Sequence, residues 1–303
     1  MDISNLFSTI DTQVLGENFR IIIQSPITFT VTDIKKKSEL LQQNFAKEKK
    51  LLLNEPRGHR GVNGCLIFPS NTDSFELLFI NHKYSIPFKY EGVAASLTAL
   101  LETGNLSPSS NGKYSVLTPY GRIYLSATLT ANQVTAISIN VTAVEKKSAD
   151  DSTIICIDQH RNYKIVPLLQ SIGAIDINNL EALTKWGEDI VEKSITSKPE
   201  LTGVLVVERL GNNRFKSITF ERDGYIRRTP GVDSTEAIIA SFKNEIQHEK
   251  SIKNETIFSS QLIADKQEKE QENYCFQLRP FITGSHDFVL DKDDPLPKGF
   301  LLK

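Results

Sequence analysis

Cysteine is scarce in this sequence and occurs in no paired motif. The three cysteines, Cys65, Cys156 and Cys275, lie far apart, and none belongs to a Cys-x-x-Cys pair. A disulfide framework and a cysteine-ligated zinc site are therefore excluded as the basis of the fold. We expect three reduced thiols that serve as small apolar core residues.

Long apolar runs and an excess of charge of one sign are also missing. No stretch approaches the roughly 20 apolar residues of a membrane-spanning helix, and the opening MDISNLFSTIDT lacks the basic and apolar regions of a signal peptide. The 35 Lys and Arg nearly balance the 37 Asp and Glu, so no basic field attracts nucleic acid or anionic lipid. We expect a cytoplasmic protein with a small-molecule partner, no nucleic acid and no membrane.

Hydrophobic residues make up 39% of the 303 residues, which is enough for two cores of ordinary size. In the first half, residues 18–32 predict a strand pair broken at Pro26. Asp33 is a plausible N-cap for the amphipathic helix that follows. Short strand-like runs then surround one apolar helix over residues 91–103, which is an α+β pattern.

The same pattern starts again near residue 150, with strands, an amphipathic helix at about 178–195, two more strands and a helix over 233–246. Asp233 or Ser234 is a natural N-cap for that last helix, and Glu236 completes a capping box with Asp233. We therefore expect two similar halves. The first covers 1–135 and is completed by 283–303, and the second covers 136–282.

Two helix beginnings are the candidate functional positions. Lys89 and Glu91 stand at the start of the 91–103 helix, and RRTPGV precedes the second one. The first N–H groups of a helix and its dipole together favour an anion. No dinucleotide-binding loop, P-loop, zinc motif or nucleophile elbow occurs in the chain, so we expect neither a cofactor nor a metal.

Four segments carry a family resemblance: STIDTQVLGE, NEPRGHRGVNGCLIFPS, TALLETG and FITGSHDFVLDKDDPLPKGFLL. In this order they resemble counterparts in the proline racemase family, which includes hydroxyproline epimerases and a related dehydratase. The resemblance runs from about residue 8 to residue 302. EPRGH and the C-terminal GSHDFVLDKDDPL are its most specific parts, and His59 within EPRGH corresponds to a hydrogen-bonded structural turn.

The resemblance implies two α/β halves, each a curled mixed sheet around a central helix as in diaminopimelate epimerase, with the active-site cleft between them. In such enzymes one cysteine from each half stands at a helix N-terminus. One thiol removes the α-proton and the other delivers a proton to the opposite face. No cofactor takes part.

This chain departs from the family at both cysteine positions. The first signature, Cys-Gly-His-Gly, aligns with residues 89–92 and puts Lys89 in place of the cysteine and Glu91 in place of the histidine. The second signature aligns with residues 227–235 and puts Gly231 in place of the other cysteine and Arg227 in place of an aspartate. A racemase that needs two thiols cannot be built from these residues.

Each changed residue has a functional and a structural interpretation. Lys89 is a possible general base, or a structural lysine that Glu91 pairs with. Glu91 and Arg227 could contact a ligand or form an ion pair with each other. Gly231 has no functional group. The resemblance gives the following candidate substrate-binding residues: Glu91, Gly92, Val93, Arg227, Val232, Asp233, Ser234 and Thr235.

Three functions compete at this point, and whether the chain is an enzyme is open. The first is a family member that binds a small amino-acid-like carboxylate, or has a structural role, without catalysis. The second is a cofactor-independent enzyme of altered chemistry, such as an epimerase, dehydratase or other lyase that uses Lys89. The third, a proline or hydroxyproline racemase, is disfavoured by the missing cysteines. A homodimer is possible in each case.

Overall fold

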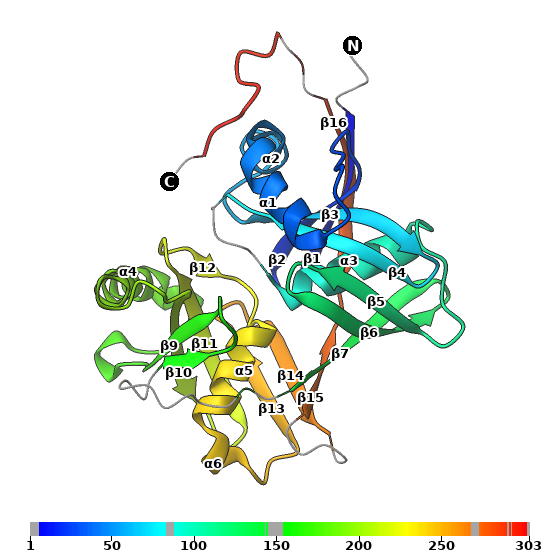
Figure 1. Cartoon of the computed structure of the whole chain (residues 1–303). Coiled ribbons are helices and arrows are strands. Elements are labelled where there is room, and N and C mark those ends of the chain that lie inside the picture. The colour runs from blue at the N-terminus through cyan, green and yellow to red at the C-terminus, as the bar shows by residue number, and fades with distance from the viewer. Residues whose placement is uncertain are drawn as a thin grey trace. The chain divides into compact units, whose positions relative to one another are not determined.

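The computed structural model describes residues 6–82, 88–142, 144, 154–267, 273–289, 291 and 293–301. The chain forms two compact units (Figure 1). The first unit contains residues 1–138 and 278–303, and the second contains residues 139–277. The division lies three residues after the predicted boundary at 135, and the return to the first unit comes five residues before the predicted 283.

The first unit contains strands that surround one helix and are flanked by two others. Its elements are β1 (Leu6–Val14), β2 (Glu17–Gln24), α1 (Ile34–Asn44), α2 (Ala46–Leu53), β3 (Val62–Asn71), β4 (Ser74–Ile80), α3 (Tyr90–Glu102), β5 (Lys113–Thr118), β6 (Gly121–Thr130), β7 (Gln133–Thr142) and β16 (Phe281–Val289). β7 extends past the boundary at residue 138. β16 returns from the far end of the chain and pairs antiparallel with β1.

The second unit is built from the elements between these strands. They are β8 (Ile154–Cys156), β9 (Asn162–Pro167), the short 3-10 helices η2 (Gln170–Ile172) and η3 (Ile177–Asn179), α4 (Leu180–Ser197), β10 (Gly203–Arg209), β11 (Arg214–Glu221), β12 (Ile226–Arg227), α5 (Val232–Ser241), α6 (Lys243–Ile246), β13 (Ser251–Glu255), β14 (Gln261–Lys266) and β15 (Asn273–Leu278).

Both units repeat one topology. In the first, the consecutive pairs β1–β2, β2–β3, β3–β4, β4–β5 and β5–β6 alternate antiparallel and parallel. The pairs β8–β9, β9–β10, β10–β11, β11–β13 and β13–β14 alternate in the same way. A parallel pair needs a crossover connection, usually a helix, and each crossover here contains helix. α3 and α5 therefore occupy equivalent places in the two units.

α3 and α5 are the central helices of their units. Eleven consecutive residues of α3, from Glu91 to Leu101, are buried, and so are nine of α5, from Val232 to Ala240. A helix buried on every side must be surrounded by other elements. α3 packs against β1, β2, β3 and β16. α5 packs against β8, β9 and β14, which lie toward opposite ends of the strand order, so the sheet of the second unit curls around it.

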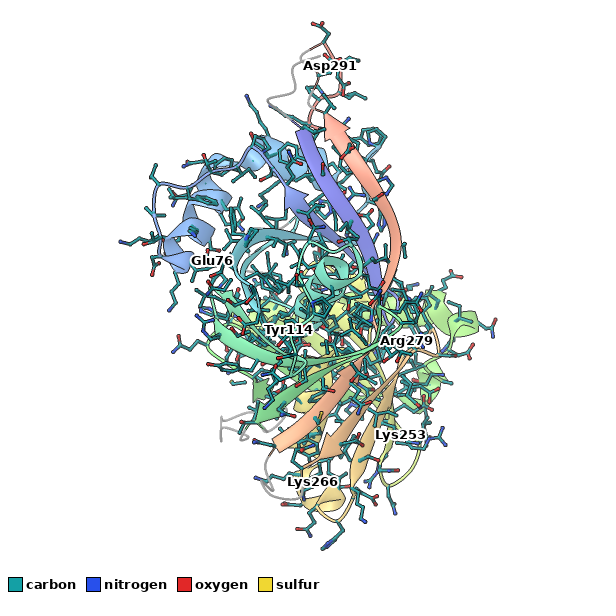
Figure 2. All side chains as sticks on the ribbon, turned by 90° about the vertical axis from the view of Figure 1, so that its right-hand side faces the viewer. Glu76, Tyr114, Lys253, Lys266, Arg279 and Asp291 are labelled. Atoms are coloured by element: carbon teal, nitrogen blue, oxygen red, sulfur yellow. The ribbon has the colours of Figure 1, made fainter. Side chains whose placement is uncertain are left out.

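Three other helices pack against the sheets: α1 against β4 and β5, α2 against β3, and α4 against β10 and β11. α4 buries Leu183, Gly187, Val191 and Ser194, which are spaced four, four and three residues apart on one face. Gly187 is required at its position, because a Cβ there would lie 2.2 Å from the ring of Phe220. Side chains fill the space between helices and strands in each unit (Figure 2). The predicted N-cap is confirmed in α1, where Asp33 accepts a hydrogen bond from the N–H of Lys36.

Three local predictions are wrong. β2 ends at Gln24, so residues 25–32 do not form the second strand that was predicted after Pro26. The helix predicted over 233–246 is two helices, α5 and α6, separated at Phe242. α5 also starts one residue earlier than predicted. Its N-cap is Gly231, so Asp233 lies inside the first turn and is not the capping residue.

The thiols are not equally buried, and the prediction of three core cysteines holds only for Cys65. Cys65 is fully buried, whereas Cys156 and Cys275 are half-buried. All three are free thiols. Among the described residues, no helix is long and apolar enough to cross a membrane.

Candidate functional site

The start of α3 holds a buried ion pair. Lys89 is the N-cap residue, in an extended conformation with φ −143° and ψ 126°, and its side chain does not cap the helix. The side chain instead turns to Glu17, with Lys89 Nζ 2.6 Å from Glu17 Oε1. The Lys89 side chain is 7% exposed and the Glu17 side chain 0%. The lysine that replaces the family's first cysteine is therefore a buried and paired cation.

Glu17 connects three elements around Lys89. It is the first residue of β2, directly after the turn from β1. Its Oε1 also accepts a hydrogen bond from Asn63 Nδ2 of β3, at 3.0 Å. Since an isolated buried carboxylate is costly, these two hydrogen bonds offset the cost of burying Glu17. The arrangement holds the ammonium of Lys89 at a fixed place beside the first turn of α3.

Some backbone N–H groups in the first turn of α3 already form hydrogen bonds within the helix. The N–H groups of Gly92 and Val93 both donate to the carbonyl oxygen of Lys89, at 3.1 and 3.4 Å. Gly92 is tightly enclosed, because a Cβ there would lie 3.0 Å from the ring of Phe19 and 3.2 Å from Cys65 Sγ. Glu91 is 1% exposed. These residues give the helix start a rigid and well-packed form.

The thiol near this turn cannot replace the missing cysteine. Cys65 Sγ lies 3.8 Å from the carbonyl oxygen of Gly92. Burial raises the pKa of the Cys65 thiol to about 12, although a hydrogen bond with Ser96 and the charge of Lys89 act in the opposite direction. At neutral pH the thiol is therefore protonated and is not a base.

The equivalent position in the second unit is Gly231, the N-cap of α5. It has φ +73°, a conformation that favours glycine. A Cβ at this position would lie 3.1 Å from both Asp233 Oδ1 and Ser234 Oγ, and 3.4 Å from Arg227 Nη1. Polar side chains therefore occupy the space that a cysteine side chain would need.

We expect Gly231→Ala to lower the free energy of unfolding by about 1–2 kcal/mol, because alanine is strained at positive φ and crowds Asp233 and Ser234. Urea denaturation measures the change. Gly211→Ala is the control, because its Cβ would meet nothing closer than 4.0 Å and its φ is not positive. Equal stability of the two variants would contradict this account of Gly231.

Arg227 and Asp233 form the centre of a buried polar cluster at the start of α5. Arg227 Nη1 lies 2.8 Å from Asp233 Oδ1, and Tyr163 Oη donates to Asp233 Oδ2 at 2.6 Å. Arg227 Nη2 donates to Tyr163 Oη at 3.1 Å, and its Nε lies 3.5 Å from Glu221 Oε1. Two carboxylates, those of Asp233 and Glu221, therefore offset the charge of Arg227.

Electrostatics in this cluster hold Asp233 ionised. Burial alone would raise the pKa of Asp233, but the charges of Arg227 and Arg161 and the hydrogen bonds from Tyr163 and Arg227 outweigh it and hold this pKa below its ordinary value. Burial raises the pKa of Tyr163. The tyrosine is therefore a neutral donor, and Asp233 a charged acceptor, at neutral pH.

The remaining predicted residues of the second signature serve the interior of the unit. Ser234 Oγ lies 3.1 Å from Thr219 Oγ1. Thr235 Oγ1 donates to the carbonyl oxygen of Gly231 at 2.8 Å and accepts from Asn254 Nδ2 at 3.0 Å. Val232 is fully buried. The structure thus places Val232, Ser234 and Thr235 together in the buried first turn of α5.

Sequence reasoning missed the partners of both helix starts. Glu17 and Asn63 contact the Lys89 region from 72 and 26 residues away in the chain, and Tyr163 reaches Asp233 from 70 residues away. A polar residue at the first position of a strand does not by itself indicate which distant residue it contacts. The sequence does contain one indication of a partner: a charged residue at the start of an otherwise apolar helix is buried, and a buried charge requires a partner.

The EPRGH turn is structural, as expected. His59 Nδ1 accepts a hydrogen bond from the N–H of Gly61 at 3.0 Å. The Arg57 guanidinium lies 3.3 Å from Asp294 and donates to the carbonyl oxygen of Pro297 at 3.0 Å, which fastens the C-terminal segment to the first unit. In the part of the chain that the structure describes, no group of three His, Cys, Asp or Glu residues is placed to hold a metal ion.

Comparisons with known proteins identify a family, relatives and solved structures that this chain resembles. Residues 9–156 match the family described as Proline racemase. A trans-3-hydroxy-L-proline dehydratase of Bacillus cereus is 28% identical, with 100% of both chains covered. A proline racemase of Acetoanaerobium sticklandii is 22% identical, with 99% of both chains covered.

A solved structure shows the same fold. The hydroxyproline epimerase of Agrobacterium vitis, with bound trans-4-OH-L-proline, has a TM-score of 0.80 over 98% of this chain and 95% of its own, at 16% identity. The fold is therefore the α+β fold of these enzymes, a mixed sheet with a few helices. The chain is therefore similar over its whole length to members of the proline racemase family.

Proposed function

We propose that this protein is a cofactor-independent lyase that eliminates water from a hydroxylated, proline-like amino acid, with Lys89 as its proton-transferring group. One observation carries the proposal: Lys89 replaces the family's first cysteine and is held at the start of α3 by Glu17, 2.6 Å away. A dehydratase among the full-length relatives supports the class of reaction.

A single proton-transferring group suits elimination better than racemisation. Racemisation requires proton removal on one face of the α-carbon and delivery on the other, so it needs two groups. The second cysteine position is Gly231, which has no functional group and where a Cβ would crowd Asp233 and Ser234. In an elimination, the group that removes the α-proton can return it to the leaving hydroxyl on the same side.

The Lys89–Glu17 pair can supply both proton transfers. A shift of one proton from Lys89 to Glu17 leaves a neutral amine, which is favoured by the low dielectric of a site where the side chains are 7% and 0% exposed. The amine then takes the proton from Cα, and the C–H electron pair forms the Cα–Cβ double bond. The Cβ–O bond breaks, and the proton on Lys89 passes to the hydroxyl, which leaves as water. Glu17 returns its proton to Lys89.

The start of α3 assists the negatively charged groups of the reaction. α3 is 13 residues long and begins one residue after Lys89. Its dipole places a partial positive charge at this end, which stabilises a substrate carboxylate and the charge that develops as the α-proton leaves. The mechanism needs a hydroxyl on the carbon next to Cα, so a 3-hydroxyproline is a substrate and a 4-hydroxyproline is not.

A second candidate is carboxylate binding without turnover. It is favoured by the second unit, where Arg227 is already paired with Asp233 and Glu221 and is not a free cation for catalysis. In that case Lys89 and Glu17 replace the missing thiol as a structural pair.

The experiment that tests the proposal follows four compounds by proton NMR in deuterated water: L-proline, D-proline, trans-4-hydroxy-L-proline and trans-3-hydroxy-L-proline. We expect only the 3-hydroxy compound to be consumed, with a cyclic imine product, and no effect of iodoacetamide because no thiol takes part. Inversion of either proline would overturn the proposal in favour of a racemase. No reaction, together with thermal stabilisation by these carboxylates, would favour the non-catalytic candidate.

A further inference from the structure

A cavity lies in the second unit, away from the start of α5. It has a volume of about 660 Å³, within the usual range for small-molecule sites. It opens where the parallel strands β9 and β10 end, and the last residue of α5, Ser241, also lines it. Since α5 has ten residues, about 15 Å of helix separates this cavity from Gly231. The cavity is therefore separate from the cluster of Arg227 and Asp233.

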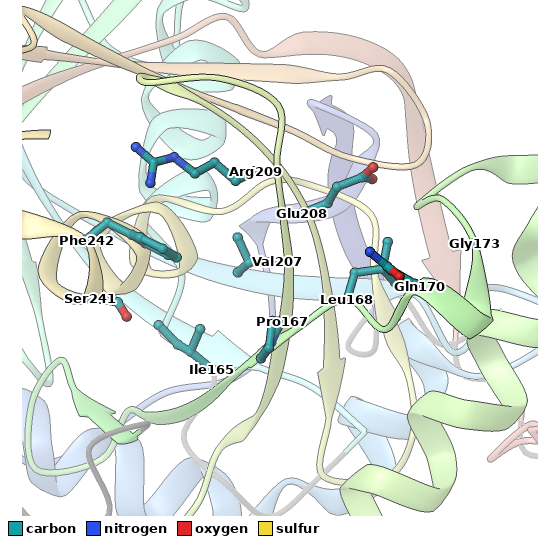
Figure 3. A pocket seen from close by; sticks show the side chains of 10 residues that line it. All are labelled: Ile165, Pro167, Leu168, Gln170, Gly173, Val207, Glu208, Arg209, Ser241 and Phe242. Carbon is teal, nitrogen blue, oxygen red and sulfur yellow. The ribbon is translucent and has the colours of Figure 1, made fainter. Parts of the chain in front are cut away.

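The cavity has an apolar wall long enough for a hydrocarbon group. Ile165, Pro167, Leu168, Val207 and Phe242 contribute apolar surface to it. Figure 3 shows Phe242 at one end, Val207 and Ile165 between, and Leu168 with Gln170 toward the other end. An apolar ligand body that covers this wall gains roughly 25 cal/mol for each Å² of surface removed from water.

The polar end of the cavity is negatively charged. Glu208 lines it, as does Gln170, and Glu208 Oε2 accepts a hydrogen bond from the N–H of Ile175 at 3.2 Å. Among the described residues no cation pairs with Glu208. Arg209 also lines the cavity, but its guanidinium pairs with Glu245 and donates to the carbonyl oxygen of Gly211. One carboxylate charge thus remains at the cavity without a counter-ion.

We infer that this cavity binds an elongated organic cation, a primary ammonium group on an apolar chain or ring. The ammonium lies at Glu208 and the side-chain oxygen of Gln170, and the apolar body lies along Leu168 and Val207 toward Phe242. A carboxylate ligand of the kind proposed for the Lys89 site would meet like charge at Glu208. The two sites therefore select ligands of opposite charge.

Isothermal titration calorimetry with n-hexylammonium tests the inference, with 1-hexanol and hexanoate as the neutral and anionic comparisons. We expect saturable binding of n-hexylammonium, at least about tenfold weaker binding of 1-hexanol and none of hexanoate. Glu208→Gln should weaken the binding of n-hexylammonium about tenfold and keep its folded spectrum, because a glutamine oxygen can still accept the bond from Ile175. Ser241→Phe should block the cavity.

Two controls make the result specific. Glu192→Gln removes the same charge from an exposed position of α4 and should not change the binding. Lys89→Arg alters the other unit and should not change it either. The inference is overturned if n-hexylammonium fails to bind at about 20 mM, if 1-hexanol binds equally well, if Glu208→Gln has no effect, or if Lys89→Arg abolishes the binding.

Discussion

Lys89→Arg should reduce the turnover of a 3-hydroxyproline substrate by about 10²–10⁴-fold, the usual contribution of one general acid–base group. Arginine keeps the positive charge, so the ion pair with Glu17 can form and the structural role is retained. It remains charged at any physiological pH and therefore cannot remove an α-proton. The measurement is kcat and KM at neutral pH, together with the thermal unfolding midpoint.

Two comparisons separate an effect of Lys89→Arg on catalysis from an effect on folding. Lys193→Arg changes an exposed lysine of α4, which is 74% exposed, and should leave both turnover and unfolding unchanged. If the larger arginine disturbs the packing at α3, the double variant Glu17→Gln/Lys89→Met removes both charges and should be folded but inactive. A Lys89→Arg protein that turns over substrate at the wild-type rate would show that Lys89 transfers no proton.

The secondary structure was largely predictable from local patterns. The 91–103 helix was predicted within one residue of α3, because its apolar residues and the KYEG segment before it define its limits. The strand after Pro26 and the single helix over 233–246 were not formed. Local propensity favoured both, but tertiary packing decides where a strand or a helix ends. The second helix is interrupted at Phe242, whose ring centroid lies 5.1 Å from that of Phe215.

The candidate site was predictable in position but not in its partners. The resemblance placed Lys89 and Gly231 at the two helix starts, and the structure has both as N-cap residues. The partners could not be read from sequence, because an ion pair depends on which strands the fold brings together. Arg227 shows the same limit: Asp233, predicted as a helix cap, is its ion-pair partner.

The difference from a cysteine at residue 231 involves the surrounding side chains as well as Gly231 itself. In place of a thiol, the start of α5 has a buried network in which Arg227 and Tyr163 both donate to Asp233 and Arg227 also donates to Tyr163 Oη. Restoring a cysteine at residue 231 would require both a change of φ from +73° and displacement of these groups. The two helix starts have therefore diverged differently, one toward a buried cation and the other toward a buried polar network.

Glu17→Ala should lower the free energy of unfolding by about 3–5 kcal/mol, the usual cost of removing one partner of a buried ion pair. The cost arises because the Lys89 ammonium, 7% exposed, would lose the carboxylate of Glu17 while it is still enclosed by the first unit. Urea denaturation followed by circular dichroism measures the change. Asp189→Ala, which breaks an exposed pair with Lys193, should cost no more than about 0.5 kcal/mol.

The double variant Glu17→Met/Lys89→Met distinguishes a lost charge partner from lost packing. Two apolar side chains of similar length remove both charges, so this variant should recover most of the stability that Glu17→Ala loses. The single tryptophan, Trp186, lies in α4 of the second unit, so its fluorescence reports unfolding outside the mutated unit. If the double variant is as unstable as Glu17→Ala, the stabilising contribution of Glu17 is packing rather than charge, and the pair is then a weak basis for proton transfer by Lys89.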